Sequence, residues 1–174
     1  VGKGILYECL ESDKVTTVVA VNRSTLNLEN PKLQEIIHKD LSDVSAIESA
    51  LTGFDACFFP LGVSVLGLSE EQYRKITYDL TLNIANTLVR LNKDLTFCYV
   101  SGVGTDSSEK GRQMWARIKG KTENDLLALP FKNAFMFRPG YIQPLKGITS
   151  KTGWYNAMYV IFKPLYFLFK AIAP

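Results

Sequence analysis

Residues 15–21, VTTVVAV, decide the fold. The stretch is almost entirely apolar or β-branched, which predicts a strand buried on both faces, as in a parallel sheet. A helical pattern over residues 4–11 comes before it, with apolar positions at Ile5, Leu6, Cys9 and Leu10. A helix that leads into a buried strand is typical of a parallel α/β architecture.

The same alternation of short apolar runs and helical patterns continues along the chain. Further strands are predicted at residues 35–39, 56–61, 95–100 and 134–137, and helices at 42–51 and 114–127. Another helix begins at Ser69 with the capping-box sequence S-E-E-Q, and its apolar face carries Tyr73, Ile76, Leu80, Ile84 and Leu88. These elements predict an α/β fold with a doubly wound parallel sheet of at least five strands, the Rossmann type. Because the leading helix needs a central strand before it, we expect the first strand and part of a glycine-rich turn to be missing from these residues.

The composition suits one packed domain. The chain has 174 residues, of which 47% are hydrophobic and 21% charged. We expect residues 1–150 to form this domain and residues 151–174 to be an apolar lid or interface segment of it. The apolar run from Trp154 to Ala173 is interrupted by charge and by Pro164, so it does not suit a membrane span. A membrane surface is therefore not an expected partner, and a homodimer interface stays open as an alternative to a lid.

Charge and cysteine content exclude other classes of protein. The net charge is +3, with 20 basic and 17 acidic residues interleaved, which excludes a nucleic-acid binder and is compatible with a small anionic ligand. Three cysteines without CxxC spacing and a single histidine make a disulfide framework or a metal site improbable. Reduced thiols predict a cytoplasmic location.

Several residues stand where a dinucleotide would bind in such a fold. Gly2 begins the first predicted helix, where free N–H groups favour a pyrophosphate. Arg23 follows the first strand and favours the 2′-phosphate of NADP, although a solvated loop arginine is the alternative. Asp40 follows the next strand and could meet the adenine or cap a helix. Leu61 and Gly62 end a later strand, where a glycine permits close backbone approach to a ligand or serves a turn.

Three stretches resemble successive landmarks of the atypical short-chain dehydrogenases/reductases. They are YVSGVG at residues 99–104, KGKTE at 119–123 and FRPGYI at 137–142. The nearest branch is the Tat-interacting-protein-like oxidoreductases, with the sugar-nucleotide epimerases as wider relatives. The resemblance implies an NAD(P)-binding Rossmann domain in which Gly2 matches the last glycine of the G-x-x-G-x-x-G turn. It also implies that Pro139 and Gly140 lie beside the nicotinamide.

The family's catalytic pattern is only partly present. Its serine, which polarises a carbonyl, corresponds to Ser101, and its lysine, which holds the ribose and lowers the pKa of a tyrosine, corresponds to Lys119. The proton-passing tyrosine would stand four residues before that lysine, where this chain has Trp115. Tyr141 is the first candidate substitute, with a packed core tyrosine as the alternative. We therefore expect an NAD(P)-dependent oxidoreductase acting on a small carbonyl substrate, or a non-catalytic nucleotide-binding redox sensor or regulatory scaffold.

Overall fold

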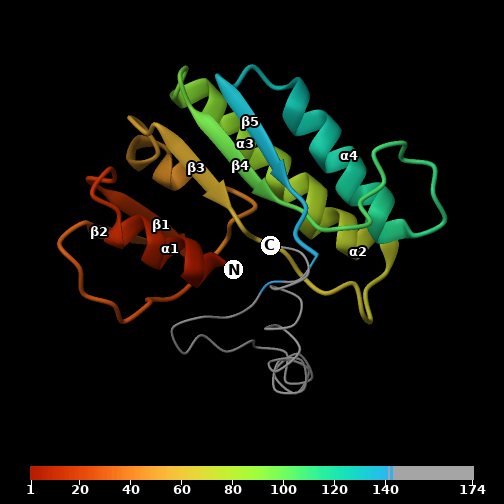
Figure 1. The fold of residues 1–174 in the computed structure, drawn as a ribbon, viewed down its shortest axis with the longest axis horizontal. Helices are drawn as coiled ribbons and strands as arrows, with labels where there is room; N and C mark the ends of the chain where they lie inside the picture. The colour runs from red at the N-terminus through yellow and green to blue at the C-terminus, as the bar shows by residue number, and fades with distance from the viewer. Residues whose placement is uncertain (141, 143–174) are drawn as a thin grey trace, which may run out of the picture.

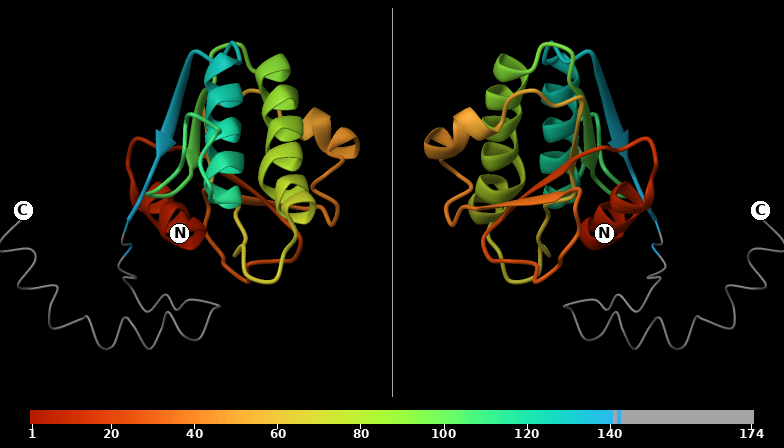
Figure 2. Two further views of the ribbon diagram at one scale, coloured as in Figure 1. Left: turned by 90° about the vertical axis from the view of Figure 1, so that its right-hand side faces the viewer. Right: turned by 90° about the vertical axis from the view of Figure 1, so that its left-hand side faces the viewer.

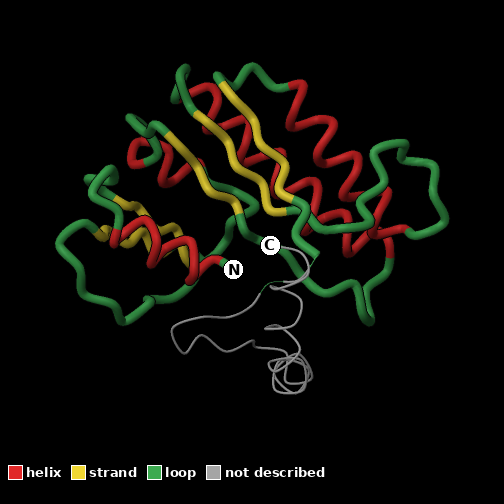
Figure 3. The backbone as a smooth tube through the Cα atoms, in the orientation of Figure 1, coloured by secondary structure: helices red, strands yellow, loops and turns green. Residues whose placement is uncertain are grey.

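The computed structural model describes residues 1–140 and 142, and its elements alternate between helices and strands (Figure 1, Figure 3). In chain order they are α1 (Gly2–Glu11), β1 (Val18–Asn22), β2 (Leu33–Ile37), the 3₁₀ helix η1 (Ser45–Ala50), β3 (Ala56–Phe59), α2 (Glu70–Arg74), the π-helical turn η2 (Lys75–Asp79), α3 (Leu80–Leu91), β4 (Thr96–Val100), α4 (Met114–Ala128) and β5 (Asn133–Phe137). The predicted α/β class with parallel strands is confirmed.

The described strands form two sheets rather than the expected single sheet of five. β1 pairs with β2, and β3, β4 and β5 pair in that order, all in parallel. No hydrogen-bonded ladder joins β1 to β3 among these strands. The position between the two sheets is the one that a central first strand occupies in a doubly wound sheet.

Helices lie on both faces of the strands. In Figure 2, α3 and α4 stand side by side on one face of β3, β4 and β5, while α1 lies on the opposite side. The hydrophobic core lies between strands β3 and β4 and the layer formed by α3 and α4. Its buried side chains are Val44, Leu51, Phe59, Ala85, Leu88, Leu95, Phe97, Tyr99 and Leu126.

The helical stretch that begins at α2 contains the predicted capping box and an unexpected turn. The Ser69 hydroxyl accepts from the backbone N–H of Gln72 at 3.2 Å, and the Gln72 side chain accepts from the backbone N–H of Ser69 at 3.0 Å. The π-helical turn η2 then shifts the register. The buried residues along α2, η2 and α3 are Tyr73, Thr77, Thr81, Ala85, Thr87 and Leu88. Tyr73 and Leu88 of the expected apolar face are therefore buried, and Leu80 and Ile84 are half-buried against the core.

One further expectation is corrected in detail. The helix predicted over residues 42–51 is a 3₁₀ helix confined to Ser45–Ala50, preceded by a bond from the Ser45 N–H to the Asp43 carboxylate at 2.9 Å. Within residues 1–140, no helix is both long and apolar enough to cross a membrane.

Candidate nucleotide-binding site

The N-terminus of α1 meets the carboxyl end of β3. A Cβ built on Gly2 would lie 3.3 Å from Cγ of Pro60, the residue that follows β3. Beyond Pro60, Leu61 is half-buried against the core and Gly62 is exposed with open space around its Cα. The structure therefore brings Gly2, Leu61 and Gly62 to one end of the strands, where ligands bind in parallel α/β folds.

A carboxylate on β2 holds the loop that carries Arg23. Glu35 accepts from the Leu26 N–H at 2.9 Å, from the Thr25 hydroxyl at 3.0 Å and from the Asn22 side-chain amide at 3.5 Å. Arg23 itself is exposed and forms no hydrogen bond or ion pair with the other described residues. This role of Glu35 had no direct signal in the sequence, because a glutamate at a half-buried strand position resembles an ordinary surface residue.

Asp40 organises a local turn after β2. Its carboxylate accepts from the Ser42 N–H at 3.0 Å and from the Ser42 hydroxyl at 2.5 Å, and these bonds hold the pKa of Asp40 below its usual value. These contacts close a turn and do not cap a helix, since the next helix, η1, has Val44 at its N-cap and no side-chain cap. A contact with adenine stays a prediction.

The carboxyl ends of β4 and β5 continue side by side. The Ser101 N–H donates to the Phe137 carbonyl at 2.7 Å, and the Val103 N–H donates to the Pro139 carbonyl at 3.1 Å. A Cβ built on Gly140 would lie 3.8 Å from the Val103 side chain. The Ser101 segment and the Pro139–Gly140 segment are thus adjacent.

The Ser101 hydroxyl is committed to a neighbour. Thr105 donates its only hydroxyl hydrogen to the Gly102 carbonyl at 2.7 Å, so the 2.9 Å contact between Ser101 Oγ and Thr105 Oγ1 has Ser101 as the donor. Ser101 is also almost fully buried. A ligand carbonyl would therefore have to compete with Thr105 for this hydrogen.

Lys119, on α4, extends toward the Tyr99 ring on β4. Its Nζ lies 5.7 Å from the centre of the Tyr99 ring, and desolvation lowers its pKa while the nearby Glu123 charge opposes the change. The Tyr99 hydroxyl is buried and has no hydrogen-bond partner among the described residues, and burial raises its pKa. A lysine in this setting can donate hydrogen bonds to hydroxyl groups, and it loses its proton at a lower pH than a surface lysine.

Trp115 packs against the loop that follows β4. A Cβ built on Gly104 would lie 3.1 Å from the edge of the indole, and Gly104 has φ +83°, a conformation that favours glycine. The indole therefore fills space beside the Ser101 loop. The only sequence signal for this contact was the presence of a glycine after β4 and a tryptophan near the start of the next helix.

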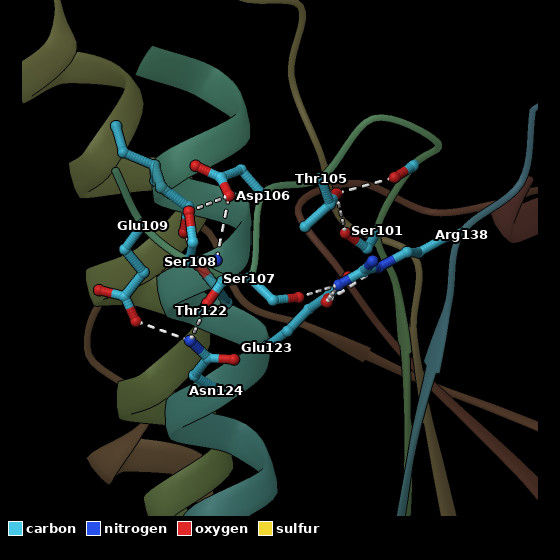
Figure 4. Close-up of polar contacts among 12 residues, drawn as sticks. Ser101, Thr105, Asp106, Ser107, Ser108, Glu109, Thr122, Glu123, Asn124 and Arg138 are labelled. Atoms are coloured by element: carbon cyan, nitrogen blue, oxygen red, sulfur yellow. Dashed lines mark hydrogen bonds and ion pairs between the residues drawn. The ribbon is translucent and has the colours of Figure 1, made fainter. Parts of the chain in front are cut away.

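The loop of residues 105–112, interpreted from sequence as a mobile segment or a solvated connection, is tied to α4 and β5 (Figure 4). Arg138 donates from Nε to Glu123 at 3.0 Å, forms a close ion pair with it through Nη2, and also donates to the Ser107 hydroxyl. Asn124 donates to the Ser107 carbonyl at 3.0 Å. Sequence reasoning missed this network, although the acid in KGKTE and the arginine of FRPG were its signals.

Inside the loop, one carboxylate forms the turn. Asp106 accepts from the Ser108 N–H at 3.0 Å, the Ser108 hydroxyl at 2.6 Å and the Gly111 N–H at 2.6 Å, and these bonds lower its pKa. The backbone of Asp106 lies directly on Gly120 of α4, where a Cβ would fall 1.8 Å from the Asp106 carbonyl oxygen. The loop is therefore a packed part of the site.

Tyr141 and residues 143–174 lie outside the described residues. The suggested proton-donating role of Tyr141, the end of the expected domain at residue 150 and the expected lid or interface segment at residues 151–174 remain predictions.

The fold is a Rossmann-like α/β fold that solved structures share. ADP-L-glycero-D-manno-heptose-6-epimerase of Helicobacter pylori matches with a TM-score of 0.60 at 18% identity, covering 79% of this chain and 50% of that one. A short-chain dehydrogenase/reductase of Burkholderia vietnamiensis matches with a TM-score of 0.54 at 15% identity, covering 92% of this chain and 84% of that one. These likenesses establish the fold.

Among sequences, the chain is similar to yeast proteins named FMP52, mitochondrial. The protein from Debaryomyces hansenii is 28% identical over 157 residues, covering 87% of this chain and 68% of that protein. The protein from Eremothecium gossypii is 32% identical over 144 residues, covering 81% of this chain and 61% of that protein. No family model matches the chain. The mitochondrial names of these relatives overturn the expected cytoplasmic location, because reduced cysteines are equally compatible with other reducing compartments.

Proposed function

We propose that this chain is the dinucleotide-binding part of an NAD(P)-dependent oxidoreductase of the atypical short-chain dehydrogenase/reductase type, in the Tat-interacting-protein-like branch. The observation that carries the proposal is the meeting of the α1 N-terminus with the end of β3 at Gly2 and Pro60. The free N–H groups of a first helical turn favour the pyrophosphate at this place. A side chain at residue 2 would press on Pro60 and narrow the approach, so the glycine fits the group.

The loop after β1 supports NADP as the preferred nucleotide, with NAD as the alternative. Arg23 is exposed and unengaged among the described residues, while Glu35 fixes the loop around it. A guanidinium on a fixed loop suits a 2′-phosphate. The backbone at Leu61 and Gly62 would border the bound nucleotide, Asp40 would border the adenine, and Pro139 with Gly140 would border the nicotinamide.

The cofactor would supply the hydride for reduction of a small carbonyl substrate. In this proposal, Lys119 binds the ribose hydroxyls and Ser101 donates to the substrate oxygen after turning its hydrogen from Thr105. Tyr141 passes the proton, since the usual tyrosine position holds Trp115.

A second candidate function is nucleotide binding without turnover, as a redox sensor or regulatory scaffold. The packing of Trp115 against Gly104 favours it, because the indole occupies the position of the usual phenol and is held there by the loop. An indole N–H does not exchange a proton near neutral pH as a phenol does. Nucleotide affinity would survive this substitution, whereas turnover would depend on Tyr141.

The test is a titration of the full-length protein with NADPH and NADH, followed by nicotinamide fluorescence. Arg23→Ala should weaken NADPH binding by roughly 10- to 100-fold, the value of one charge-assisted contact, and leave NADH binding nearly unchanged. Lys132→Ala is the matched control, since this exposed lysine precedes β5 at the opposite end of the strands. If neither nucleotide binds the wild-type protein, the proposal is wrong.

Turnover is tested next, with a panel of small aldehydes and ketones and NADPH consumption as the readout. An oxidoreductase requires that Ser101→Ala and Tyr141→Phe each reduce the rate while nucleotide affinity stays within about twofold. Binding without consumption by any compound would favour the sensor or scaffold. We also propose a mitochondrial location, in keeping with the relatives' names, which fractionation of cells expressing the full-length protein would test.

A further inference from the structure

Two lysines on α4 stand at the same spacing from an acid, but only one of them pairs with it. Lys121 and Asp125, four residues apart, form an ion pair at 2.9 Å. Lys119 and Glu123 have the same order and separation on the same helix, where side chains four residues apart are neighbours. Among the described residues, however, Lys119 forms no ion pair or hydrogen bond, and its Nζ lies 5.7 Å from the centre of the Tyr99 ring. Spacing alone therefore does not decide which pair forms.

The difference lies in Arg138, which binds both oxygens of the Glu123 carboxylate. Arg138 directly follows β5 and donates from Nε to Oε1 and to Oε2 of Glu123 at 3.0 Å each, and its Nη2 forms a close ion pair with Oε2 (Figure 4). The Glu123 side chain is only 3% exposed, so it needs an ionic partner inside the protein. A guanidinium that contacts both carboxylate oxygens is a stronger and more directional partner than an ammonium. This contact leaves Lys119 without the carboxylate.

We propose that Arg138 is a positioning residue for the nucleotide, because by occupying Glu123 it keeps the Lys119 ammonium free to donate to the ribose hydroxyls. This inference rests on the proposed role of Lys119. Without Arg138, Glu123 would be a buried carboxylate with a lysine one helical turn away, and the two would pair as Lys121 pairs with Asp125. An ammonium held in that pair would have to leave it before it could bind a ribose.

The charges around Lys119 agree with this division of roles. Burial lowers the pKa of Lys119 and the Glu123 charge opposes that change, so the carboxylate is close enough to attract the ammonium. Hydrogen bonds to Glu123 raise the pKa of Arg138, as expected of a guanidinium held by this carboxylate. The ring beside the ammonium, Tyr99, stays neutral because burial raises its pKa. Among the described residues, Glu123 is therefore the anion that would compete with a ribose for Lys119.

The test measures two properties of the full-length protein: the pKa of Lys119 without nucleotide, by NMR of isotopically methylated lysines, and the affinity for NADPH. Arg138→Gln should raise the pKa of Lys119 and weaken NADPH binding by roughly tenfold, the value of one charge-assisted hydrogen bond. Adding Glu123→Gln to this variant should reverse both changes, because no carboxylate remains to hold Lys119. Arg90→Gln is the matched control, since it also removes an ion-paired arginine, the partner of Glu48, and should change neither property.

The outcomes separate this role from a structural one and from failure of the proposed function. If Arg138 only stabilises the fold, Arg138→Gln would weaken binding without raising the pKa of Lys119, and Glu123→Gln would not restore affinity; this result would overturn the proposal. If the wild-type protein binds no nucleotide, the proposed function is wrong, whereas a raised pKa that Glu123→Gln reverses would still support the competition for Glu123. Arg138→Lys provides a milder variant with the same directions of change if Arg138→Gln does not fold, and unchanged properties in a folded variant overturn the proposal.

Discussion

Replacement of Gly120 by alanine is expected to destabilise the protein, although alanine is the better helix former. Gly120 lies in the middle of α4, where the exchange would ordinarily stabilise a helix by about 1 kcal/mol. The added Cβ would fall 1.8 Å from the carbonyl oxygen of Asp106 and 2.5 Å from its carbonyl carbon. Both atoms belong to backbone, so no rotation of a side chain relieves the overlap, and the loop of residues 105–112 must move away from the helix.

The magnitude follows from what this movement breaks. The Asp106 N–H donates to the Ala116 carbonyl at 3.1 Å, and Asn124 donates to the Ser107 carbonyl at 3.0 Å. Two such bonds contribute about 1 kcal/mol each, and forced overpacking costs about 1–3 kcal/mol. After the gain in helix propensity of about 1 kcal/mol is subtracted, the net loss is about 2–4 kcal/mol.

The assay is urea denaturation followed by circular dichroism, with Gly4→Ala as the matched control. Gly4 is also helical, but a Cβ there would meet nothing within 4 Å, so its replacement should stabilise by about 0.5–1 kcal/mol. The two variants should therefore change stability in opposite directions. A Gly120→Ala protein as stable as the wild type, with an unchanged m-value, would refute the packing argument.

Three further outcomes are expected. Arg138→Ala should lower the free energy of unfolding in urea by about 3 kcal/mol, because it leaves the Glu123 carboxylate, whose side chain is 3% exposed, without its ion pair. Arg90→Ala is the control: it breaks an exposed ion pair and should lower the free energy of unfolding by less than about 1 kcal/mol. Ser69→Ala should cost about 1 kcal/mol by removing the capping box, and a loss within error of zero in the same assay would contradict that role. The hydrogen bonds that lower the pKa of Asp106 stabilise the folded protein when this carboxylate is charged. Their contribution is fully present at pH values above the usual pKa of 3.8 and is lost as the pH falls through the lower pKa of the folded state. Thermal melts of Asp106→Asn should therefore depend less on pH below 3.8 than those of the wild type.

The alternation of elements could be predicted because burial on both faces leaves continuous apolar runs. The runs around β1 and β4 and the capping box at Ser69 were placed within a few residues of the observed elements. The full pattern of burial after Ser69 could not be predicted, since Thr77 of η2 and Thr81 of α3 are buried beside the apolar face and the spacing of apolar residues does not mark them.

The site was predictable in its positions and less so in its contacts. Strand ends and the helix start follow from topology, which is why Gly2, Leu61 and Gly62 were found together. The contacts between Glu35 and the Arg23 loop, and between Arg138 and Glu123, join residues distant in sequence, and periodicity carries no information about such pairs.

The separation of the described strands into two sheets has a consequence for how a dinucleotide would stabilise the protein. The adenosine side of the proposed site, with Arg23, lies on the β1–β2 unit, whereas Ser101 and Gly140 lie on the β3–β5 unit. In a protein limited to residues 1–174, where no ladder joins the described strands of the two units, they are expected to open in separate steps during amide hydrogen exchange. A nucleotide that bridged them would act as a cross-link, merging two cooperative units into one and protecting β2, which is remote from the hydride, as strongly as β4.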